Sequence, residues 1–266
     1  MKVFCSLILI LFVFSEQIFG FSFRSNKRDA SEESTDNEHN DPPERAIDCQ
    51  ELMEKGVVES GIYEVCPKNK ERELFCFEVY CDMNEEGGGW TFLERRGNFG
   101  YPSDYFYRNW QNYSQGFGDL DKEFWLGLDK MHSLTKEEIY FLRIDMKIFD
   151  GRVIKTAYRN FKIGSEEEKY PLSYCRYPYP EYPEGHLLSE ARNQRFSTYD
   201  DHQENVWQSK CNDHKIGGWW YQSCLSTMAF HRKNMQNRCG WSMGWQWDRY
   251  AYSLLTFEMR IRRKIP

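Results

Sequence analysis

Acidic, amide and sulfur-bearing side chains crowd into one segment of the sequence, FSTYDDHQENVWQSKCNDHKIGGWWYQSC, which runs from Phe196 to Cys224. Its first half holds the side chains with atoms suited to a metal ion: Asp200, Asp201, His202 and Glu204. Calcium takes oxygen ligands of this kind, whereas Cys211 and Cys224 offer thiolates for zinc or the two halves of a disulfide. The residue types therefore predict one of three structures: a calcium loop, a zinc knuckle or a disulfide-closed loop.

The chain begins with MKVFCSLILILFVFSEQIFG, which combines one lysine with an apolar run from Val3 to Phe14. That run is shorter than the ~20 residues needed to span a bilayer, and it is typical of a secretory signal. We therefore expect a signal peptide at residues 1–20, cleaved near Gly20. The mature protein is predicted to be secreted and extracellular, with no membrane span.

A polar segment follows the signal. Residues 21–45 turn from basic to acidic and contain Pro42-Pro43, a composition that favours a disordered acidic linker or propeptide. Lys27-Arg28 is either a processing site or a pair of solvated basic residues. The segment has no heptad or Gly-X-Y repeat, so it predicts neither a coiled-coil stalk nor a collagen stalk.

Cysteine number constrains the exported chain further. Outside the signal the sequence holds an even set, which in an exported protein indicates disulfides: Cys49, Cys66, Cys76, Cys81, Cys175, Cys211, Cys224 and Cys239. Such a set allows roughly 105 connectivities, so spacing alone selects none of them. Because no thiol is left over to join a partner chain, any homo-oligomer is expected to be non-covalent.

Zinc has one candidate ligand set in this sequence: Cys211, His214, Cys224 and His231. A structural zinc site usually has two tight ligand pairs separated by a longer insert. The insert here contains GGWWY, which is typical of a packed strand, and oxidising export removes the thiolates that zinc needs. The sequence therefore disfavours zinc.

Residues 46–266 are dense in aromatics and glycines and contain no internal repeat, so we expect one domain there. Hydrophobic patterns and capping residues predict helices at Cys49–Lys55, Arg108–Tyr113 and Lys122–Leu128. The same patterns predict strands at Gly61–Val65, Glu73–Tyr80, Trp90–Arg95, Tyr140–Phe149, Arg152–Tyr158 and Leu254–Ile261. The expected class is α+β, an antiparallel sheet with short helices and two long loops, Tyr170–Glu184 and Phe196–Trp219.

Charge and motif content argue against two classes of function. The net charge is −6 and the acids are dispersed, which argues against nucleic acid as a partner. The sequence has no nucleophile elbow and no HExxH motif. Gly87-Gly88-Gly89 opens a predicted strand and so lacks the helix N-terminus that would hold a phosphate. We therefore expect a binding protein and not an enzyme.

Six motifs, in order along the chain, resemble the fibrinogen C-terminal domain family: DCQELMEKGVVESGIYEV, FEVYCDMNEEGGGWTFLERR, NWQNYSQGFGDLDKEFWLGLDKMHSLT, FST, GGWWYQSC and YSLLTFEMRIRR. The family includes ficolins, angiopoietins and arthropod tachylectins, and the resemblance spans Asp48–Arg263. The lack of a stalk is most similar to the tachylectins. The resemblance implies the fibrinogen C-terminal globular fold, with long disulfide-stapled loops.

The resemblance also implies two disulfides, Cys49–Cys81 and Cys211–Cys224. Cys66 and Cys76 flank the turn PKNKEREL, and we then expect them to bridge their own hairpin. This leaves Cys175 to pair with Cys239.

In the lectin members of this family, the acids that follow FST hold calcium. A direct match puts His202 and Glu204 at the ligand positions, whereas a shifted match puts Asp201 and Gln203 there. Imidazole is a poor ligand for calcium, which prefers oxygen. The two interpretations are a weakened or reshaped calcium site, with Asp200 beside it, and a solvated acidic loop.

The same lectins bind an N-acetyl group in an aromatic-lined pocket beside the second disulfide. Here Leu225 stands where the family has a histidine, and His231 or His214 would have to supply the donor instead. The candidate ligand-binding residues lie in and after the GGWWY framework: Tyr221, Ser223, Cys224, Phe230, Tyr250 and Tyr252. Trp219 and Trp220 are predicted to be core, because large aromatic side chains dominate buried area.

The resemblance implies a secreted lectin of innate immunity that binds N-acetylated glycans on microbial or cell surfaces with calcium support. Agglutination would need at least two sites and hence an oligomer. The alternative is a fibrinogen-like protein-interaction module, or a venom or other secretion component, with an eroded sugar pocket; His202 and Leu225 favour it. Asn112-Tyr-Ser114 is an N-glycosylation acceptor unless burial blocks it.

Overall fold

The computed structural model describes residues 45–68, 75–102, 104–148, 151–176, 188, 191–201, 217–221 and 254–263. All of them lie in one compact unit, Arg45–Pro266. The predicted signal peptide at residues 1–20 and the linker as far as residue 44 lie outside the described residues. No helix in the described part of the chain is long and apolar enough to cross a membrane.

The helices in the described residues are α1 (Cys49–Glu54), the short 3-10 helix η1 (Glu85–Gly87), α2 (Trp110–Gln115) and α3 (Leu128–Thr135). The strands are β1 (Gly61–Val65), β2 (Phe77–Asp82), β3 (Trp90–Arg96), β4 (Phe117–Gly118), β5 (Phe124–Trp125), β6 (Tyr140–Ile148), β7 (Val153–Ile163), β8 (Leu172–Arg176) and β9 (Leu254–Arg262). The predicted α+β class is confirmed.

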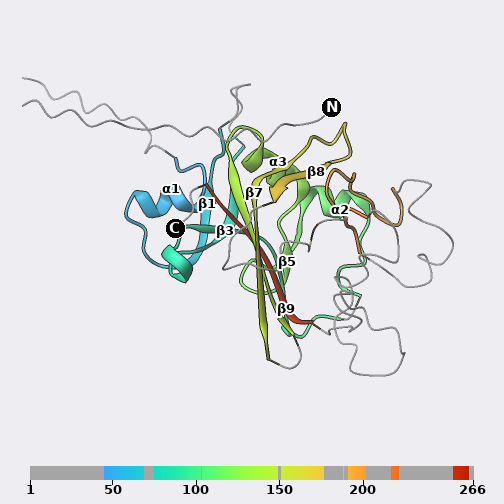
Figure 1. Ribbon diagram of the computed structural model, residues 1–266, viewed down its shortest axis with the longest axis horizontal. Coiled ribbons are helices and arrows are strands. Elements are labelled where there is room, and N and C mark those ends of the chain that lie inside the picture. The colour runs from blue at the N-terminus through green and yellow to red at the C-terminus, as the bar shows by residue number, and fades with distance from the viewer. Residues whose placement is uncertain are drawn as a thin grey trace, which may run out of the picture. The chain divides into compact units, whose positions relative to one another are not determined.

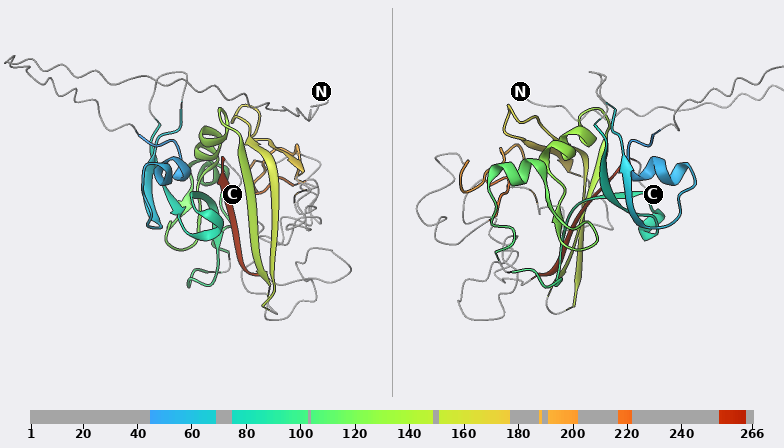
Figure 2. Two further views of the ribbon diagram at one scale, coloured as in Figure 1. Left: turned by 60° about the vertical axis from the view of Figure 1, so that its left-hand side comes forward. Right: turned by 180° about the vertical axis from the view of Figure 1, so that it is seen from behind.

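The last strand of the chain lies inside the sheet and not at its edge. The described strands form one antiparallel sheet in the order β1-β2-β3-β9-β6-β7-β8, and the β4–β5 hairpin attaches to β3 (Figure 1). The further views in Figure 2 show β9, in red, between the N-terminal strands and the β6–β7 hairpin. Arg260 pairs in register with Phe92 of β3 and with Arg143 of β6, so β9 joins the two parts of the sheet.

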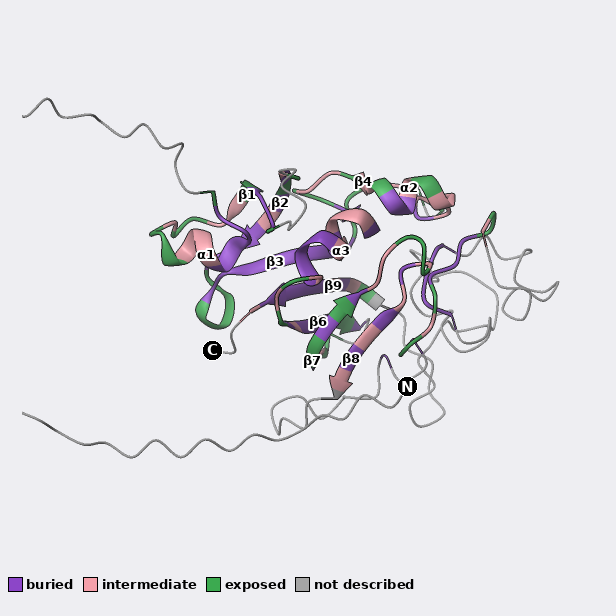
Figure 3. Cartoon of the chain, turned by 90° about the horizontal axis from the view of Figure 1, so that it is seen from above, coloured by how far each residue is buried: buried purple, intermediate pink, exposed green. Residues whose placement is uncertain are grey.

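Buried side chains concentrate in β3, β6, β9 and α3 (Figure 3). Leu142 and Ile144 of β6 pair with Ile261 and Met259 of β9, and all four side chains are fully buried. Burying a side chain of this size stabilises a fold by about 1.5–3 kcal/mol. The β6–β9 contact is therefore a main part of the core.

The first predicted helix is confirmed together with its cap. Asp48 Oδ1 accepts a hydrogen bond from the Glu51 amide at 2.9 Å, and Gly56, with φ of +96°, follows the end of the helix. The other carboxylate oxygen, Oδ2, accepts from Tyr140 Oη and from Arg263 Nε, both at 2.7 Å. One capping residue thus ties α1 to β6 and to the end of β9.

Two predictions of local structure are wrong. The predicted helix Lys122–Leu128 is instead the strand β5 followed by Gly127, because Phe124 and Trp125 are buried against β3 and pair with β4. The hairpin needs glycine at 118, where an added Cβ would lie 2.3 Å from the Glu123 carbonyl oxygen. The predicted loop Tyr170–Glu184 contains the strand β8.

The structure joins Cys49 to Cys81, between α1 and β2, and Cys66 to Cys76, between β1 and β2. Both are pairs expected from the sequence and the family resemblance. Cys175 on β8 is also disulfide-bonded, and its partner lies outside the described residues, as do Cys211, Cys224 and Cys239. The pairs Cys211–Cys224 and Cys175–Cys239 stay predictions.

Candidate ligand-binding site

Two sequence motifs from the predicted ligand region meet in the structure. Ser197 donates its amide to the Trp219 carbonyl at 3.0 Å, and Trp219 donates its amide back to the Ser197 carbonyl at 3.1 Å. This bridge joins the segment Phe196–Asp201 to the segment Gly217–Tyr221. The two segments form the described part of the candidate site.

An aromatic floor, made of Tyr113, Trp125, Phe196 and Trp220, lies beneath this bridge. The Phe196 ring centroid is 5.0 Å from Trp220, 5.2 Å from Tyr113 and 5.7 Å from Trp125. An added Cβ at Gly218 would lie only 2.7 Å from the Phe196 ring, so this packing requires glycine there. Aromatic pairs at such separations add stability beyond the area they bury. The floor therefore fixes both segments.

Both tryptophans of the GGWWY framework are core residues, as predicted. Trp219 and Trp220 are 1% and 0% exposed. The Trp220 indole Nε1 donates to the Tyr170 carbonyl at 2.7 Å, which satisfies its buried polar atom. Neither ring presents a face to solvent.

Tyr221, predicted to line a ligand pocket, packs in the core instead of at an open surface. It is 1% exposed, and its hydroxyl donates to the Gly217 carbonyl at 2.6 Å. Burial raises its pKa well above the usual tyrosine value. The other predicted ligand-binding residues lie outside the described residues: Ser223, Cys224, Phe230, Tyr250 and Tyr252.

Asp200, a predicted calcium ligand, is engaged by protein donors. Its Oδ1 accepts the Trp110 amide at 2.9 Å, at the start of α2, and the Thr198 hydroxyl at 2.7 Å. Thr198 also donates its amide to the Asp201 carbonyl at 2.8 Å. These bonds close a tight turn and attach it to α2.

Asp201, the second described calcium candidate, faces a lysine. Lys169 Nζ lies 2.5 Å from Asp201 Oδ2 and 4.7 Å above the Trp110 ring centroid. Calcium needs several free oxygen ligands, and both described aspartates already accept from protein donors, so in this conformation they do not fit an open calcium site. His202 and Glu204 lie outside the described residues.

A second metal hypothesis concerns the β1–β2 end of the sheet. In the described part of the chain, the only grouping of metal-ligand atoms is Glu64 with Cys66 and Cys76, within 4.8 Å of one another. The two sulfurs belong to one disulfide, so no thiolate is available and only one carboxylate remains. This group cannot hold a metal ion.

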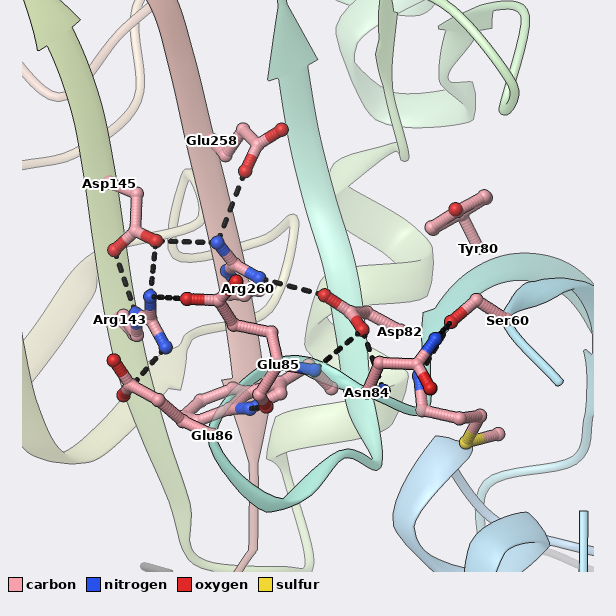
Figure 4. Close-up of polar contacts among 12 residues, drawn as sticks. Ser60, Tyr80, Asp82, Asn84, Glu85, Glu86, Arg143, Asp145, Glu258 and Arg260 are labelled. Carbon is pink, nitrogen blue, oxygen red and sulfur yellow. Dashed lines mark hydrogen bonds and ion pairs between the residues drawn. The ribbon is translucent and has the colours of Figure 1, made fainter. Parts of the chain in front are cut away.

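An ionic cluster with two buried arginines crosses the sheet beside η1 (Figure 4). Arg143 and Arg260 both contact Asp145 Oδ2 at 2.5 Å, and Arg260 Nη1 contacts Asp82 Oδ2 at 3.1 Å. The Arg143 guanidinium, with Lys155, also lowers the pKa of Glu85 to about 2. Because these charges pair with one another, the cluster fastens β9 and η1 to β6.

A groove of about 610 Å³ lies between the β1–β2 hairpin, the β4–β5 hairpin and α3. Its lining includes Ile62, Glu78, Phe117, Leu120, Phe124 and Lys130. Of the predicted site residues that the structure describes, Asp200, Asp201 and Tyr221 do not line it. The groove is therefore separate from the described part of the candidate site.

The glycosylation acceptor Asn112 lies within α2 and is half-buried, while Ser114 two residues later is 6% exposed.

Sequence reasoning missed Glu94 of β3, a carboxyl that is 3% exposed. Burial, with a contribution from Glu123, raises the Glu94 pKa to about 7. Only its place directly after the apolar pair Phe92-Leu93 signals it in the sequence.

Comparisons with known proteins agree with this architecture. The family model described as "Fibrinogen beta and gamma chains, C-terminal globular domain" matches residues 45–264. The chain is 36% identical over 219 residues to Techylectin-5A of Tachypleus tridentatus, covering 81% of this chain and 73% of that protein. It is 33% identical over 229 residues to Fibrinogen C domain-containing protein 1-A of Xenopus laevis, covering 81% of this chain but 47% of that protein.

Solved structures give the same result. The fibrinogen-like globe domain of human ANGPTL2 superposes with a TM-score of 0.69 at 31% identity, covering 83% of this chain and 100% of that one. Lamprey fibrin D-dimer, complexed with the peptide Gly-His-Arg-Pro-amide, gives a TM-score of 0.65 at 27% identity, covering 81% of this chain and 73% of that one. The fold of the described residues is thus the fibrinogen-like globe.

Proposed function

Because the chain belongs to the fibrinogen C-terminal domain family, we propose that it is a secreted lectin that binds N-acetylated glycans on microbial or cell surfaces. The observation that carries the proposal is the 36% identity over 219 residues to Techylectin-5A, whose name identifies it as a lectin. Its role would be innate immune recognition or agglutination, by binding and not by catalysis.

The proposed sugar pocket lies on the loops that the aromatic floor supports. The floor and the Ser197–Trp219 bridge hold the segments Phe196–Asp201 and Gly217–Tyr221 in one place. The remaining candidate contacts follow Tyr221 along the chain: Ser223, Cys224, Phe230, Tyr250 and Tyr252. Aromatic walls with few polar groups suit an acetyl methyl and its carbonyl.

His202 and Glu204 would have to bind the calcium that supports glycan binding. The described aspartates are both engaged, Asp200 by a backbone amide and a hydroxyl and Asp201 by Lys169. When bound, calcium would supply a rigid anchor for the loop through oxygen ligands. The remaining side-chain candidates are His202, Gln203 and Glu204, of which only Glu204 is a carboxylate, so we expect at most weak calcium dependence.

A glycan array tests the proposal directly. The full chain, secreted from eukaryotic cells, is applied in calcium and again in EDTA. We expect binding to N-acetylated sugars over their non-acetylated counterparts, with little change in EDTA. No binding to any glycan would reject the lectin, and binding with no preference for the acetyl group would reject N-acetylated glycans as its ligands.

A second candidate function is a protein- or peptide-binding module that keeps the fold without the sugar pocket. Two observations favour it: Leu225 replaces the donor expected in the lectins, and the similar lamprey fibrin is complexed with a peptide. Titration calorimetry with Gly-His-Arg-Pro-amide as the probe tests this function. Heat from this peptide, together with a silent glycan array, would support the module over the lectin.

Three further properties belong to the proposal. If the protein is secreted, it should be found in the culture medium. If Asn112 is glycosylated, the secreted chain should lose mass on treatment with a glycosidase specific for N-linked glycans. Agglutination requires more than one site, so light scattering after gel filtration should give a mass above that of one chain, without intermolecular disulfides.

A further inference from the structure

The turn before β8 holds two successive residues in a conformation that side chains usually avoid. Lys169 and Tyr170 have φ of +66° and +45°, and neither is glycine. Left-handed backbone at such residues is strained and persists only where surrounding contacts fix it. Here the Lys169 amide donates to the Glu166 carbonyl and the Tyr170 amide to the Ser165 carbonyl, both at 2.8 Å.

This turn delivers the Lys169 side chain to the candidate site. Its ammonium contacts Asp201 Oδ2 at 2.5 Å and lies 4.7 Å from the Trp110 ring centroid. The Trp110 indole in turn donates to Glu166 Oε1 at 2.9 Å. The Lys169 carbonyl accepts the Phe196 amide at 2.8 Å, so the same residue holds both ends of the segment Phe196–Asp201.

We propose that the Lys169 ammonium is the built-in cation of this loop, and that it holds Phe196–Asp201 against α2 without a divalent ion. An ammonium in contact with the Asp201 carboxylate neutralises it and repels a second cation. The cation–π contact with Trp110 adds to this attraction. Calcium could use Asp201 only by displacing a lysine that its own turn holds in place.

The proposal is independent of which ligand the protein binds, and its test therefore does not use a ligand. Hydrogen–deuterium exchange at the Phe196 and Thr198 amides measures how firmly the segment Phe196–Asp201 is held, because these amides donate to the Lys169 and Asp201 carbonyls. In the wild-type protein we expect the same protection in calcium and in EDTA.

Replacing the lysine should release the segment. We expect Lys169→Met to speed exchange at Phe196 and Thr198 by roughly five- to thirtyfold, as expected for losing one partly exposed ion pair and one cation–π contact. Lys169→Arg, which keeps the charge, should retain part of the protection. Lys147→Met, at an exposed lysine on β6, is the matched control and should leave the segment unchanged.

Removal of the lysine should also change the response to calcium. With the Asp201 carboxylate free, calcium should slow exchange in Lys169→Met while having no effect on the wild type, a response that a merely structural lysine would not produce. Protection of the wild-type segment by calcium, normal protection in Lys169→Met, or no calcium response in that variant would each overturn the proposal.

If Lys169→Met exchanges fast throughout β6 as well, Asp201→Asn decides, because it keeps the lysine and its turn. Faster exchange confined to Phe196–Asp201 in that variant supports the built-in cation, and unchanged exchange overturns it.

Discussion

Glu94 on β3 is a buried carboxyl whose charge opposes folding at neutral pH. It is 3% exposed, its Oε2 has no hydrogen-bond partner, and the closest approach of Arg96 Nε to its Oε1 is 3.8 Å. Burial raises its pKa from 4.5 to about 7. A carboxyl with a raised pKa contributes its full stability below pH 4.5 and loses it as the pH rises through 7. Glu94→Gln keeps the shape and removes the charge, so we expect it to stabilise the protein above pH 7.

The magnitude follows from the two pKa values. A difference of about 2.5 pKa units at 1.36 kcal/mol per unit gives a penalty of about 3 kcal/mol at pH 8. The same relation gives about 1.4 kcal/mol at pH 5.5 and less than about 0.5 kcal/mol at pH 4.5. These are upper values, because the glutamine variant also removes the charge partner of Arg96. Arg96 keeps its position over the Phe106 ring, 3.8 Å from the centroid.

Urea unfolding of wild type and Glu94→Gln at several pH values between 4.5 and 8 measures this difference. The gap in unfolding free energy should open as the pH rises, with the variant more stable. Glu64→Gln, at an exposed position on β1, is the control and should show no such gap. A gap that stays constant with pH, or a variant less stable than wild type at pH 8, would refute the reasoning.

Three other substitutions test the packing and the ion pairs. Gly218→Ala pushes a methyl into the Phe196 ring and should destabilise the domain by about 1–3 kcal/mol in thermal unfolding; an unchanged melting temperature would contradict the close packing. Arg260→Gln removes the ion pairs to Asp82 and Glu258 and one of two to Asp145, which keeps Arg143, and should cost about 1–3 kcal/mol in urea unfolding, against no loss if the cluster is solvated. Asn109→Ala removes the cap that accepts the Asn112 amide and should cost about 1 kcal/mol, whereas Asn109→Asp should retain most of it.

Local signals predicted the elements that depend on local interactions. The α1 helix follows from its cap at Asp48, and β1 was predicted at its observed bounds from its alternating pattern. The strand β9 was found because LLTFEMRIR is rich in apolar side chains, but its place between β3 and β6 follows from pairing with residues about 110 to 170 positions earlier. The fold as a whole came from the family resemblance and not from such patterns.

Tertiary contacts decided the elements that the sequence predicted wrongly. Lys122–Leu128 has the composition of a short amphipathic helix, yet Phe124 and Trp125 gain more by pairing with β3 and β4 inside the core. In the candidate site, the acids after FST signalled a cation, but the lysine that meets Asp201 lies 32 residues earlier. No spacing rule links those two positions, because an irregular turn with left-handed residues brings them together.

The position of β9 makes the candidate site depend on the strand Leu254–Arg262. Trp219, beside the aromatic floor, contacts Phe257 of β9 with ring centroids 6.4 Å apart. Arg260 in the same strand pairs with Asp145 on the neighbouring strand β6 and with Asp82 at the end of β2. Without β9 the edges of β3 and β6 would be unpaired, and unpaired strand edges favour aggregation. We therefore expect the site to form only when β9 is paired in the sheet. For this reason, binding should be measured on the full chain and not on an isolated site fragment.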